Sequence, residues 1–419
     1  MDTIFAEATP PGRGGVSIVR ISGPLSRKVL EALTGALPEA RRSYLRAVRD
    51  AGELIDRAMV LRFEEGHSFT GEESGEFHLH GAPVVVNRLT ESLVKRGLRR
   101  AEAGEFTRRA FLNGKMDLAE TEGFADLLSA ETEAQRKLAM RASDGEIGRM
   151  ADSLRERLVH AGALIEVSID FADEEVPDEV PVEVFTLVDS VRADIRKLLK
   201  SYPATERLRQ GYEVAIVGPP NAGKSTLLNR IGKRDIALVS NIPGTTRDVL
   251  ELATDLRGLP VTFLDTAGNR TSDDPVEAMG VERGTRRAAS ADLRLHLSAT
   301  GDFPVDEGED DILIHSKSDI YARNGLAISA ETGDGVEELL LLVYDRLRCR
   351  AEESGLIGHK RQAEALERAD STLAVSPEMP PEMLAEALRH ASLCLAEMVG
   401  RVGSEDYLDK IFSSFCIGK

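Results

Sequence analysis

The segment from Gly218 to Ser225 constrains the fold of this chain more than any other feature of its 419 residues. Its letters, GPPNAGKS, match the pattern G-x-x-x-x-G-K-[ST], and an apolar run precedes it at 212–217. Glycines let backbone N–H groups turn inward around phosphate, Lys224 can reach outer phosphates, and the Ser225 hydroxyl can bind Mg²⁺. The flanking strand and helix patterns disfavour the alternative, a chance glycine-rich turn. With a second apolar run ending at Asp265, the segment predicts a mostly parallel α/β domain around a phosphate-binding loop.

Three later segments follow in the order typical of GTPases. The loop 244–248 offers Thr246 as a second magnesium ligand, although a solvated turn is an equally good interpretation of this loop taken alone. Asp265 closes a strand, which suits a water-mediated magnesium contact, and Gly268 suits an N–H directed at the γ-phosphate. The stretch 329–333, SAETG, resembles the loop that supports a guanine base. Together these segments predict a guanine-nucleotide site.

The segment that would read guanine departs from the usual pattern. GTPases use N-K-x-D, whose aspartate accepts two hydrogen bonds from guanine, whereas residues 316–319 read SKSD. Ser316 is shorter than asparagine and cannot bridge loops as an amide can. We therefore expect guanine selectivity to survive through Asp319 with weaker affinity. The stretch 292–319 is also short and acidic, and its usual strand is represented only weakly, by 293–297.

Charge and cysteine content exclude several classes of protein. The chain has 53 basic and 71 acidic residues, so its net charge is −18. No chain-wide field attracts nucleic acid, and RNA would have to be held by a local cluster such as 95–100 or by a partner. Cys349, Cys394 and Cys416 form neither a disulfide framework nor a zinc spacing. With no apolar run of ~18 residues and no signal-peptide pattern, we expect a cytoplasmic protein without a membrane segment.

The first part of the chain predicts a mixed α/β domain over residues 1–115. Alternating apolar and polar residues favour strands at 16–21, 58–63 and 76–80. A stretch without a breaker after Pro83, residues 84–96, favours a helix.

The rest of the chain predicts a helical host with an inserted α/β domain. Apolar residues at helical spacing indicate a first helical part over 116–208, interrupted by an acidic, proline-containing connection at 170–179. The phosphate-loop domain is expected over 209–349. A second helical part is expected over 350–419, and the two parts could fold together because insertion favours hosts whose ends lie close in space.

These features together resemble the family of tRNA-modification GTPases called MnmE or TrmE. The resemblance covers nearly the whole chain. It includes the opening segment 2–15, the segments SFTGE at 68–72 and GEFTRRAFLNGK at 104–115, and the final FCIGK at 415–419. A phosphate loop inserted in a helical domain, combined with the segments 2–15 and 415–419, is highly specific for this family. The resemblance implies an N-terminal folate-binding and dimerising domain, a helical domain and an inserted Ras-like P-loop domain.

The resemblance also implies how GTP would be hydrolysed. Asn269 stands where many small GTPases have a water-orienting glutamine, and no arginine finger can be assigned from the sequence. In this family K⁺ neutralises charge between the β- and γ-phosphates when two such domains face each other. Asn221 matches its side-chain ligand, Glu277 matches the acid that orients the attacking water, and Ser240, Ile242 and Thr245 match the loop that completes the cage. Serine at 240 and proline at 243 depart from the usual pattern.

The nucleotide-site candidates share positions in the four motifs of the inserted domain. They are Asn221, Ala222, Gly223, Lys224, Ser225, Thr226, Ser240, Asn241, Ile242, Pro243, Gly244, Thr245, Thr246, Asp265, Thr266, Ala267, Gly268, Ser316, Lys317, Ser318 and Asp319.

A second site is implied for a folate, either formyl- or methylene-tetrahydrofolate. Arg20, Glu76, Lys115 and Lys419 match the family's folate-contacting positions, although from the residues alone exposed surface charges would be the simpler interpretation. Cys416 lies in the terminal motif, where a thiol could act as a nucleophile or be a small buried side chain.

The implied activity is that of a potassium-activated GTPase in tRNA modification. With a flavoprotein partner resembling MnmG (GidA), a homodimer of the chain would form a heterotetramer. The complex would install an aminomethyl or carboxymethylaminomethyl group at C5 of the wobble uridine. GTP hydrolysis would open and close the GTPase domains. Two rivals are a ribosome-assembly GTPase, which would need a basic RNA-binding module, and a non-hydrolysing scaffold, suggested by Ser316.

Overall fold

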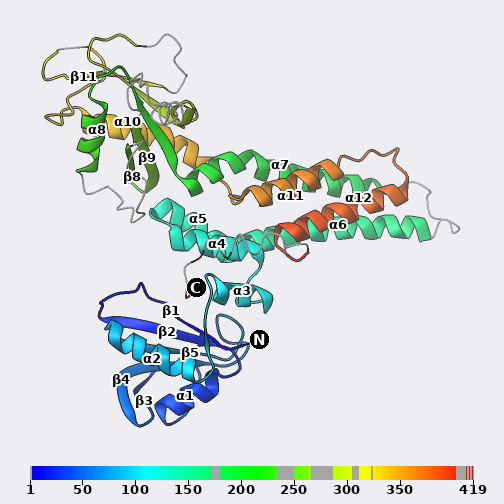
Figure 1. Ribbon diagram of the computed structural model, residues 1–419. Coiled ribbons are helices and arrows are strands. Elements are labelled where there is room, and N and C mark those ends of the chain that lie inside the picture. Colours follow the sequence, from blue (N-terminus) through cyan, green and yellow to red (C-terminus); the bar gives the residue numbers. More distant parts are fainter. Residues whose placement is uncertain are drawn as a thin grey trace, which may run out of the picture. The chain divides into compact units, whose positions relative to one another are not determined.

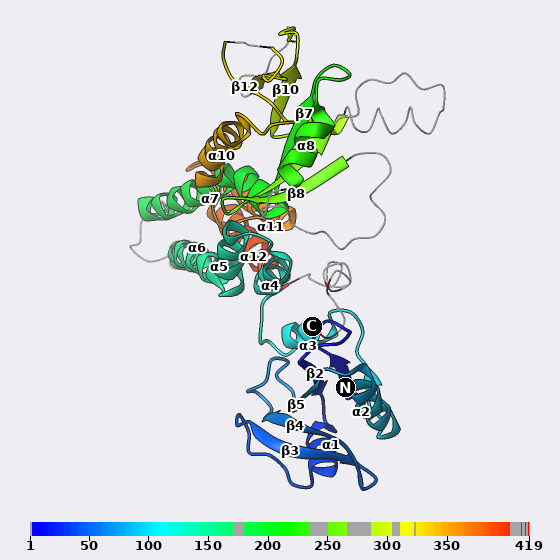
Figure 2. The same ribbon diagram turned by 90° about the vertical axis from the view of Figure 1, so that its left-hand side faces the viewer.

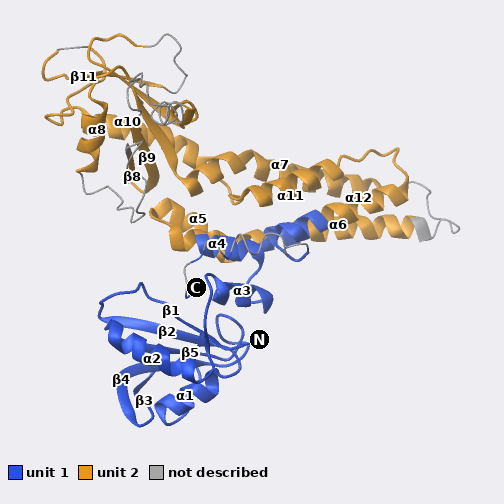
Figure 3. Cartoon of the chain, viewed as in Figure 1, with its two compact units in different colours: residues 1–125, 148–152, 393–419 blue, residues 126–147, 153–392 orange. Residues whose placement is uncertain are grey.

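The computed structural model describes residues 2–170, 180–233, 250–265, 286–303, 311–321 and 324–402, together with residues 412, 415 and 418. The chain divides into two compact units (Figure 3). Unit 1 comprises residues 1–125, 148–152 and 393–419, and unit 2 comprises residues 126–147 and 153–392.

Unit 1 is built on a six-stranded mixed sheet with the order β3-β4-β5-β2-β1-β6 (Figure 1). All neighbours are antiparallel except β1 and β6. The predicted strands and the predicted helix of this region are confirmed. The elements are β1 (Ile4–Glu7), β2 (Val16–Ser22), α1 (Ser26–Thr34), β3 (Tyr44–Asp50), β4 (Glu53–Phe63), β5 (Ser74–His80), α2 (Pro83–Lys95), β6 (Arg99–Arg100), α3 (Glu105–Leu112) and α4 (Leu118–Ser129).

The two faces of this sheet differ in what covers them. One face is buried against α1 and α2, and the core there includes Val19, Val60 and Phe77, each 0% exposed. On the other face Leu45 lies opposite Met59 in the register, and their exposed fractions are 72% and 45%. The second face therefore reaches the surface of unit 1 at β3 and β4, whereas at β1 it packs on Phe106 of α3.

The helices of unit 2 bring together segments that are far apart in the sequence. Helix α7 packs on α11, and Asp370 of α11 binds Arg192 at 3.0 Å and Arg196 at 3.2 Å. The helical stretches before and after the inserted domain are therefore neighbours. The helices are α5 (Glu133–Ser143), α6 (Glu146–Asp170), α7 (Val182–Gln210), α11 (Lys360–Thr372) and α12 (Pro381–Met398), of which α6 and α12 extend into unit 1. Within the described ranges no helix is long and apolar enough to cross a bilayer.

Unit 2 also contains a six-stranded sheet with the order β12-β11-β10-β7-β9-β8. Every neighbouring pair is parallel except β8 with β9, so the predicted mostly parallel α/β domain is confirmed. Figure 2 shows helix α8 beside this sheet. The elements are β7 (Tyr212–Val217), α8 (Lys224–Gly232), β8 (Leu250–Leu256), β9 (Leu259–Asp265), β10 (Leu293–Ser298), β11 (Ile312–Ser316), β12 (Ala327–Ile328) and α10 (Val336–Glu352).

Strand β10 is more regular than its sequence indicated. It pairs with β7 on one side and β11 on the other. Two of its side chains, Arg294 and His296, point to the same face of the sheet, and both bind the carboxylate of Asp311 at 2.9 Å. An internal ion pair therefore compensates two polar residues that made this central strand look weak.

Candidate functional site

The phosphate loop begins where β7 ends, and its backbone requires glycine at two points. Gly218 has φ +148°, and a Cβ there would lie 2.2 Å from the carbonyl oxygen of Leu297 on β10. Gly223 has φ +98° and caps the N-terminus of α8. Asn221 between them also has a left-handed φ, +62°. Because L side chains rarely adopt these angles, the loop sequence and its conformation are tightly linked.

Lys224 is a buried cation held against this loop. Its residue is 6% exposed, and its Nζ donates hydrogen bonds to the carbonyl oxygens of Gly218 at 2.9 Å and Pro219 at 3.0 Å. Burial lowers the pKa of this ammonium, and the nearby carboxylate of Asp265 partly opposes that shift. The positive charge is thus directed to the loop, where a polyphosphate would bind.

Ser225 and Asp265 meet beside Lys224, although they are 40 residues apart in the sequence. The Ser225 hydroxyl donates to Oδ2 of Asp265 at 2.5 Å. Oδ1 of Asp265 is buried and has no hydrogen-bond partner within the described part of the chain. Hydroxyl and carboxylate oxygens suit Mg²⁺, which is commonly held by one or two protein groups together with phosphates. The pair therefore fits a magnesium ion in the way the sequence predicted for each residue.

The guanine-reading segment lies at the end of β11. Ser316 is 4% exposed, and its hydroxyl has no hydrogen-bond partner among the residues that the structure describes. Lys317 has φ +60°, and Asp319 is exposed. The turn thus presents Asp319 outward while Ser316 stays in the sheet.

Arg230 is a site residue that sequence reasoning missed. It lies on α8, and its guanidinium donates to the carbonyl oxygens of Ala330, at 2.9 Å, and Glu331. The predicted base-supporting loop, 329–333, is thereby tied to the helix that follows the phosphate loop. No motif marks Arg230, because its role depends on carbonyl groups a hundred residues away.

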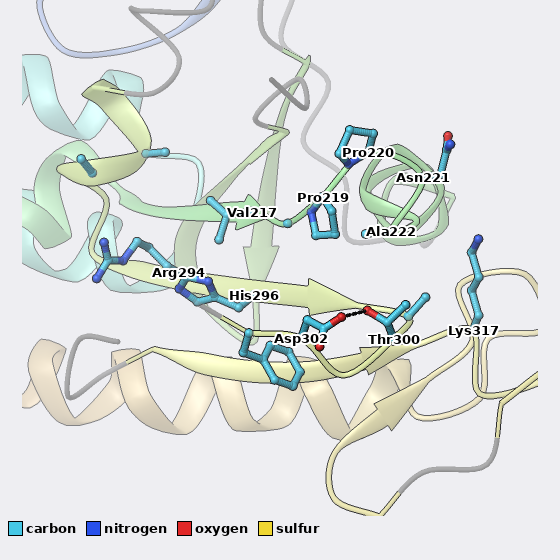
Figure 4. Close-up of a pocket in the computed structure, with 15 residues that line it drawn as sticks. Val217, Pro219, Pro220, Asn221, Ala222, Arg294, His296, Thr300, Asp302 and Lys317 are labelled. Carbon is cyan, nitrogen blue, oxygen red and sulfur yellow. Dashed lines mark hydrogen bonds between the residues drawn. The ribbon is translucent and has the colours of Figure 1, made fainter. Parts of the chain in front are cut away.

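A cavity of about 870 Å³ lies beside the phosphate loop (Figure 4). One wall is apolar and includes Val217, Pro219 and Pro220. The opposite side includes Arg294 and His296 of β10. Thr300 and Asp302 are joined there by a 2.8 Å hydrogen bond. The remaining lining residues are Gly218, Asn221, Ala222, Ala288, Ala289, Ala299, Phe303 and Lys317.

In unit 1 the structure brings together two of the predicted folate-site residues. Arg20 binds Glu76 at 2.9 Å, and its guanidinium lies 5.6 Å from the ring centre of Phe69 and 5.8 Å from that of Phe106. Lys115 donates to the carbonyl oxygen of Gly66 at 2.9 Å. Arg20 and Glu76 thus form one cluster of charge and aromatic rings, while Lys115 fastens a neighbouring loop.

The two histidines beside Glu76 have separate partners. His78 contacts Glu76 at 3.0 Å, and His80 contacts Asp56 at 2.8 Å. Over the described residues no group of three or more metal-ligating side chains is found.

A second buried cation, Arg109, was not predicted as a site residue. Its side chain is 5% exposed and binds three carboxylates: Asp2 at 2.8 Å, Glu105 at 3.0 Å and Glu72 at 3.1 Å. Arg99 also binds Asp2 and Glu105, at 2.8 and 2.7 Å. The cluster joins the segment before β1, the loop before β5 and α3, so it holds these parts of unit 1 together.

Two of the four cations in the expected basic cluster at 95–100 are paired with carboxylates. Arg96 binds Asp50 at 2.8 Å, and Arg99 belongs to the carboxylate cluster just described. Charge alone suggested a surface for RNA here, but the partners of these arginines lie in segments distant in the sequence. The charges of Arg96 and Arg99 are therefore paired with carboxylates of unit 1.

Of the other predicted site residues, Thr226 lies in α8 and Ser318 lies in the turn after β11. The rest lie outside the described residues. They are Ser240, Asn241, Ile242, Pro243, Gly244, Thr245, Thr246, Thr266, Ala267, Gly268, Glu277, Cys416 and Lys419.

Known proteins are similar to this chain along its full length. The model of the MnmE helical domain matches residues 118–416, and that of the GTP-binding protein TrmE N-terminus matches residues 3–115. A protein from Paracoccus denitrificans, named tRNA modification GTPase MnmE, is 70% identical over 419 residues, which is all of both chains. A protein of the same name from Cereibacter sphaeroides is 48% identical over 428 residues, again all of both chains. A solved structure of Era with MgGDPNP and 16S ribosomal RNA is 26% identical, covers 41% of this chain and 69% of its own, and has a TM-score of 0.27.

The family models cover both the N-terminal and the helical parts, and the full-length relatives include the phosphate loop. The chain belongs to the MnmE family of tRNA modification GTPases.

Proposed function

We propose that this chain hydrolyses GTP and acts in the modification of tRNA. The observation that carries the proposal is the cluster at the phosphate loop, where buried Lys224 lies beside the Ser225–Asp265 pair. Bound Mg²⁺ would neutralise charge on the β- and γ-phosphates. Lys224 would bind outer phosphate oxygens, and the loop N–H groups would orient the rest of the chain of phosphates. Membership of the family supports tRNA modification as the purpose of the hydrolysis.

We further propose that K⁺ activates the hydrolysis. Asn221 supports this because its left-handed backbone places an amide side chain at the middle of the loop, and oxygen ligands suit a hard cation. Ser240, Ile242 and Thr245 would supply the remaining ligands, and Glu277 would orient the attacking water. Two GTPase domains of a homodimer would face each other around this site.

A folate would supply the one-carbon unit from unit 1. The Arg20–Glu76 pair supports the proposal, since a guanidinium can bind a carboxylate tail and a carboxylate can accept from a pterin N–H edge. Lys115 and Lys419 would complete the site, and Cys416 would face the transferred group. The flavoprotein partner MnmG would contribute FAD, and the heterotetramer would modify C5 of the wobble uridine in the cytoplasm. In this proposal the chain consists of an N-terminal domain over 1–115, a GTPase domain over 209–349, and a helical domain formed by 116–208 and 350–419.

The potassium proposal is tested by GTP turnover in matched KCl and NaCl. We expect slow turnover in Na⁺ that rises strongly in K⁺, and loss of the rise in Asn221→Ala with Mg²⁺-dependent nucleotide binding retained. Glu277→Ala should bind GTP and turn it over slowly. Equal rates in the two salts would overturn potassium activation while leaving GTP hydrolysis in place.

The tRNA proposal is tested by mass analysis of wobble nucleosides from cells that lack this chain. We expect the modified uridines to disappear and to return with the wild-type chain but not with Lys224→Ala. Unchanged uridines would favour a ribosome-assembly GTPase instead.

Equal affinity for ATP and GTP would contradict the role assigned to Asp319 in guanine selectivity.

A further inference from the structure

Strand β3 forms one edge of the sheet in unit 1 and is unusually rich in arginine. Residues 41–50 contain Arg41, Arg42, Arg46 and Arg49, and Arg57 lies on the adjacent strand β4. All are exposed except Arg46, which is half-buried. Figure 2 shows β3 at the border of the sheet, next to α1. These cations therefore lie on or beside the edge strand, and the register places Arg46, opposite Ala58, and Arg57, opposite Ala47, on opposite faces of the sheet.

The carboxylates near this edge are bound to cations other than Arg41, Arg46, Arg49 and Arg57. Asp50 binds both Arg88, at 3.2 Å, and Arg96, at 2.8 Å, and Asp56 binds His80. Glu39 binds Arg42 at 2.9 Å. In contrast, none of the following four arginines has a carboxylate within ion-pair distance in the described ranges: Arg41, Arg46, Arg49 and Arg57. The local charge is strongly positive.

Two of these arginines are held in place by groups that leave their charge intact. The guanidinium of Arg46 lies 5.0 Å from the ring centre of Tyr44, and its Nε is buried without a hydrogen-bond partner among the described residues. Arg49 donates to the carbonyl oxygen of Gly52 at 3.1 Å. A positioned guanidinium loses less side-chain entropy when it binds phosphate and can bind two oxygens at once.

We propose that this arginine edge, formed by Arg41, Arg46, Arg49 and Arg57, binds the phosphate backbone of the tRNA. The inference rests on the proposed function, which makes tRNA the polyanion present. Residues 1–115 contain 18 basic and 15 acidic residues, although the whole chain has a net charge of −18. An acidic chain holds RNA through such a local patch, and phosphate contacts position the RNA without reading its sequence. In the cluster at 95–100, Arg96 and Arg99 bind carboxylates, which leaves only Lys95 and Arg100 without an ion pair in the described ranges.

The test measures binding of the full chain to unfractionated tRNA between about 50 and 200 mM KCl. In Arg46→Gln/Arg49→Gln we expect the slope of log affinity against log salt to fall by about two. The affinity at low salt should fall on the order of tenfold. The matched control, Lys197→Gln/Lys200→Gln, removes two exposed cations of α7 in unit 2 and should leave both quantities unchanged.

Arginine on an edge strand can also serve to prevent aggregation through that edge. Arg46→Lys/Arg49→Lys keeps the positive charge, so its edge strand should still resist aggregation. This variant should also retain the slope of log affinity against log salt. An unchanged slope in the glutamine variant, equal losses in the control, or a defect only in binding the flavoprotein would overturn the proposal. Wobble-uridine analysis and GTP turnover stay separate readouts, so failure of the edge is distinguishable from failure of the proposed function.

Discussion

The two units each bury a cation, but they compensate its charge in opposite ways. Arg109 in unit 1 is surrounded by Asp2, Glu72 and Glu105, and these contacts raise its pKa against the effect of burial. Lys224 in unit 2 is hydrogen-bonded to two carbonyl oxygens, and burial lowers its pKa. Both residues are less than 7% exposed.

The difference separates a structural charge from one kept for a ligand. A cation neutralised within the chain contributes to folding, and removing it leaves buried carboxylates without a partner. A buried cation that hydrogen-bonds to carbonyl oxygens and has no paired carboxylate costs folding free energy, so its retention points to an external anion. The exposed fractions of Arg109 and Lys224 alone would not distinguish the structural charge from the one kept for a ligand.

The largest expected effect is the loss of activity in Lys224→Met. Without the ammonium, outer phosphate charge is no longer stabilised in the transition state, and kcat/KM for GTP should fall by at least about a hundredfold. The free energy of unfolding should change by less than about 1 kcal/mol, because the carbonyl oxygens of Gly218 and Pro219 lose a donor but no carboxylate loses a paired cation. Steady-state GTP hydrolysis and thermal unfolding measure the two effects. A large loss of stability with intact turnover would reverse the assignment.

The next effect is a loss of stability in Arg109→Met. Glu72 and Glu105 would remain largely buried without their partner, and unit 1 should lose about 3 kcal/mol. Hydrogen exchange of peptides from 68–73 and 104–112 locates the loss without assuming that the whole chain unfolds in one step. GTP turnover should be unchanged. Wild-type protection in these peptides would show that the carboxylate cluster contributes nothing to the fold.

The smallest effect concerns pH and the same cluster. Hydrogen bonding by Arg99, followed by that of Arg109, lowers the pKa of Asp2 from 3.8 to about 2. Since the folded-state pKa lies below the unfolded value, its contribution is present above about pH 4 and is lost as the pH falls from 4 to 2. Asp2 is half-exposed, so the change should stay below about 1 kcal/mol. Asp2→Asn should flatten the acid side of the stability curve of unit 1. The control is Asp144→Asn in unit 2, which should leave the acid side of the stability curve of unit 1 unchanged.

The sequence predicted the phosphate site better than the charge clusters for a physical reason. Lys224 and Ser225 lie in one local motif, and Asp265 ends a strand whose neighbour is set by the parallel topology. Two of the three partners of Arg109, Asp2 and Glu72, come from distant segments, so spacing carries no signal for them, whereas Glu105 lies one turn away on the same helix. Arg96 and Arg99 were assigned to a surface because charge is visible in a sequence and its neutralisation is not.

Strand β10 is a second case in which a charge is compensated by a residue that the local sequence pattern does not identify. The sequence represents this strand only weakly, and two of its five residues at 293–297, Arg294 and His296, are polar. Asp311, from a segment dense in acidic residues, supplies the missing compensation. The acidity that seemed to interrupt the domain is therefore partly what allows a polar pair on its central strand.

The insertion of the parallel sheet into the helical host has a consequence for how such a chain can arise. Arg207, near the end of α7, binds Asp292 at 3.2 Å, and Arg350 of α10 donates to the carbonyl oxygen of the same residue. The incoming and outgoing connections are thus within reach of one residue. A module whose two ends meet can be gained, exchanged or removed in a single genetic event, because the interrupted host needs only a short splice to close again.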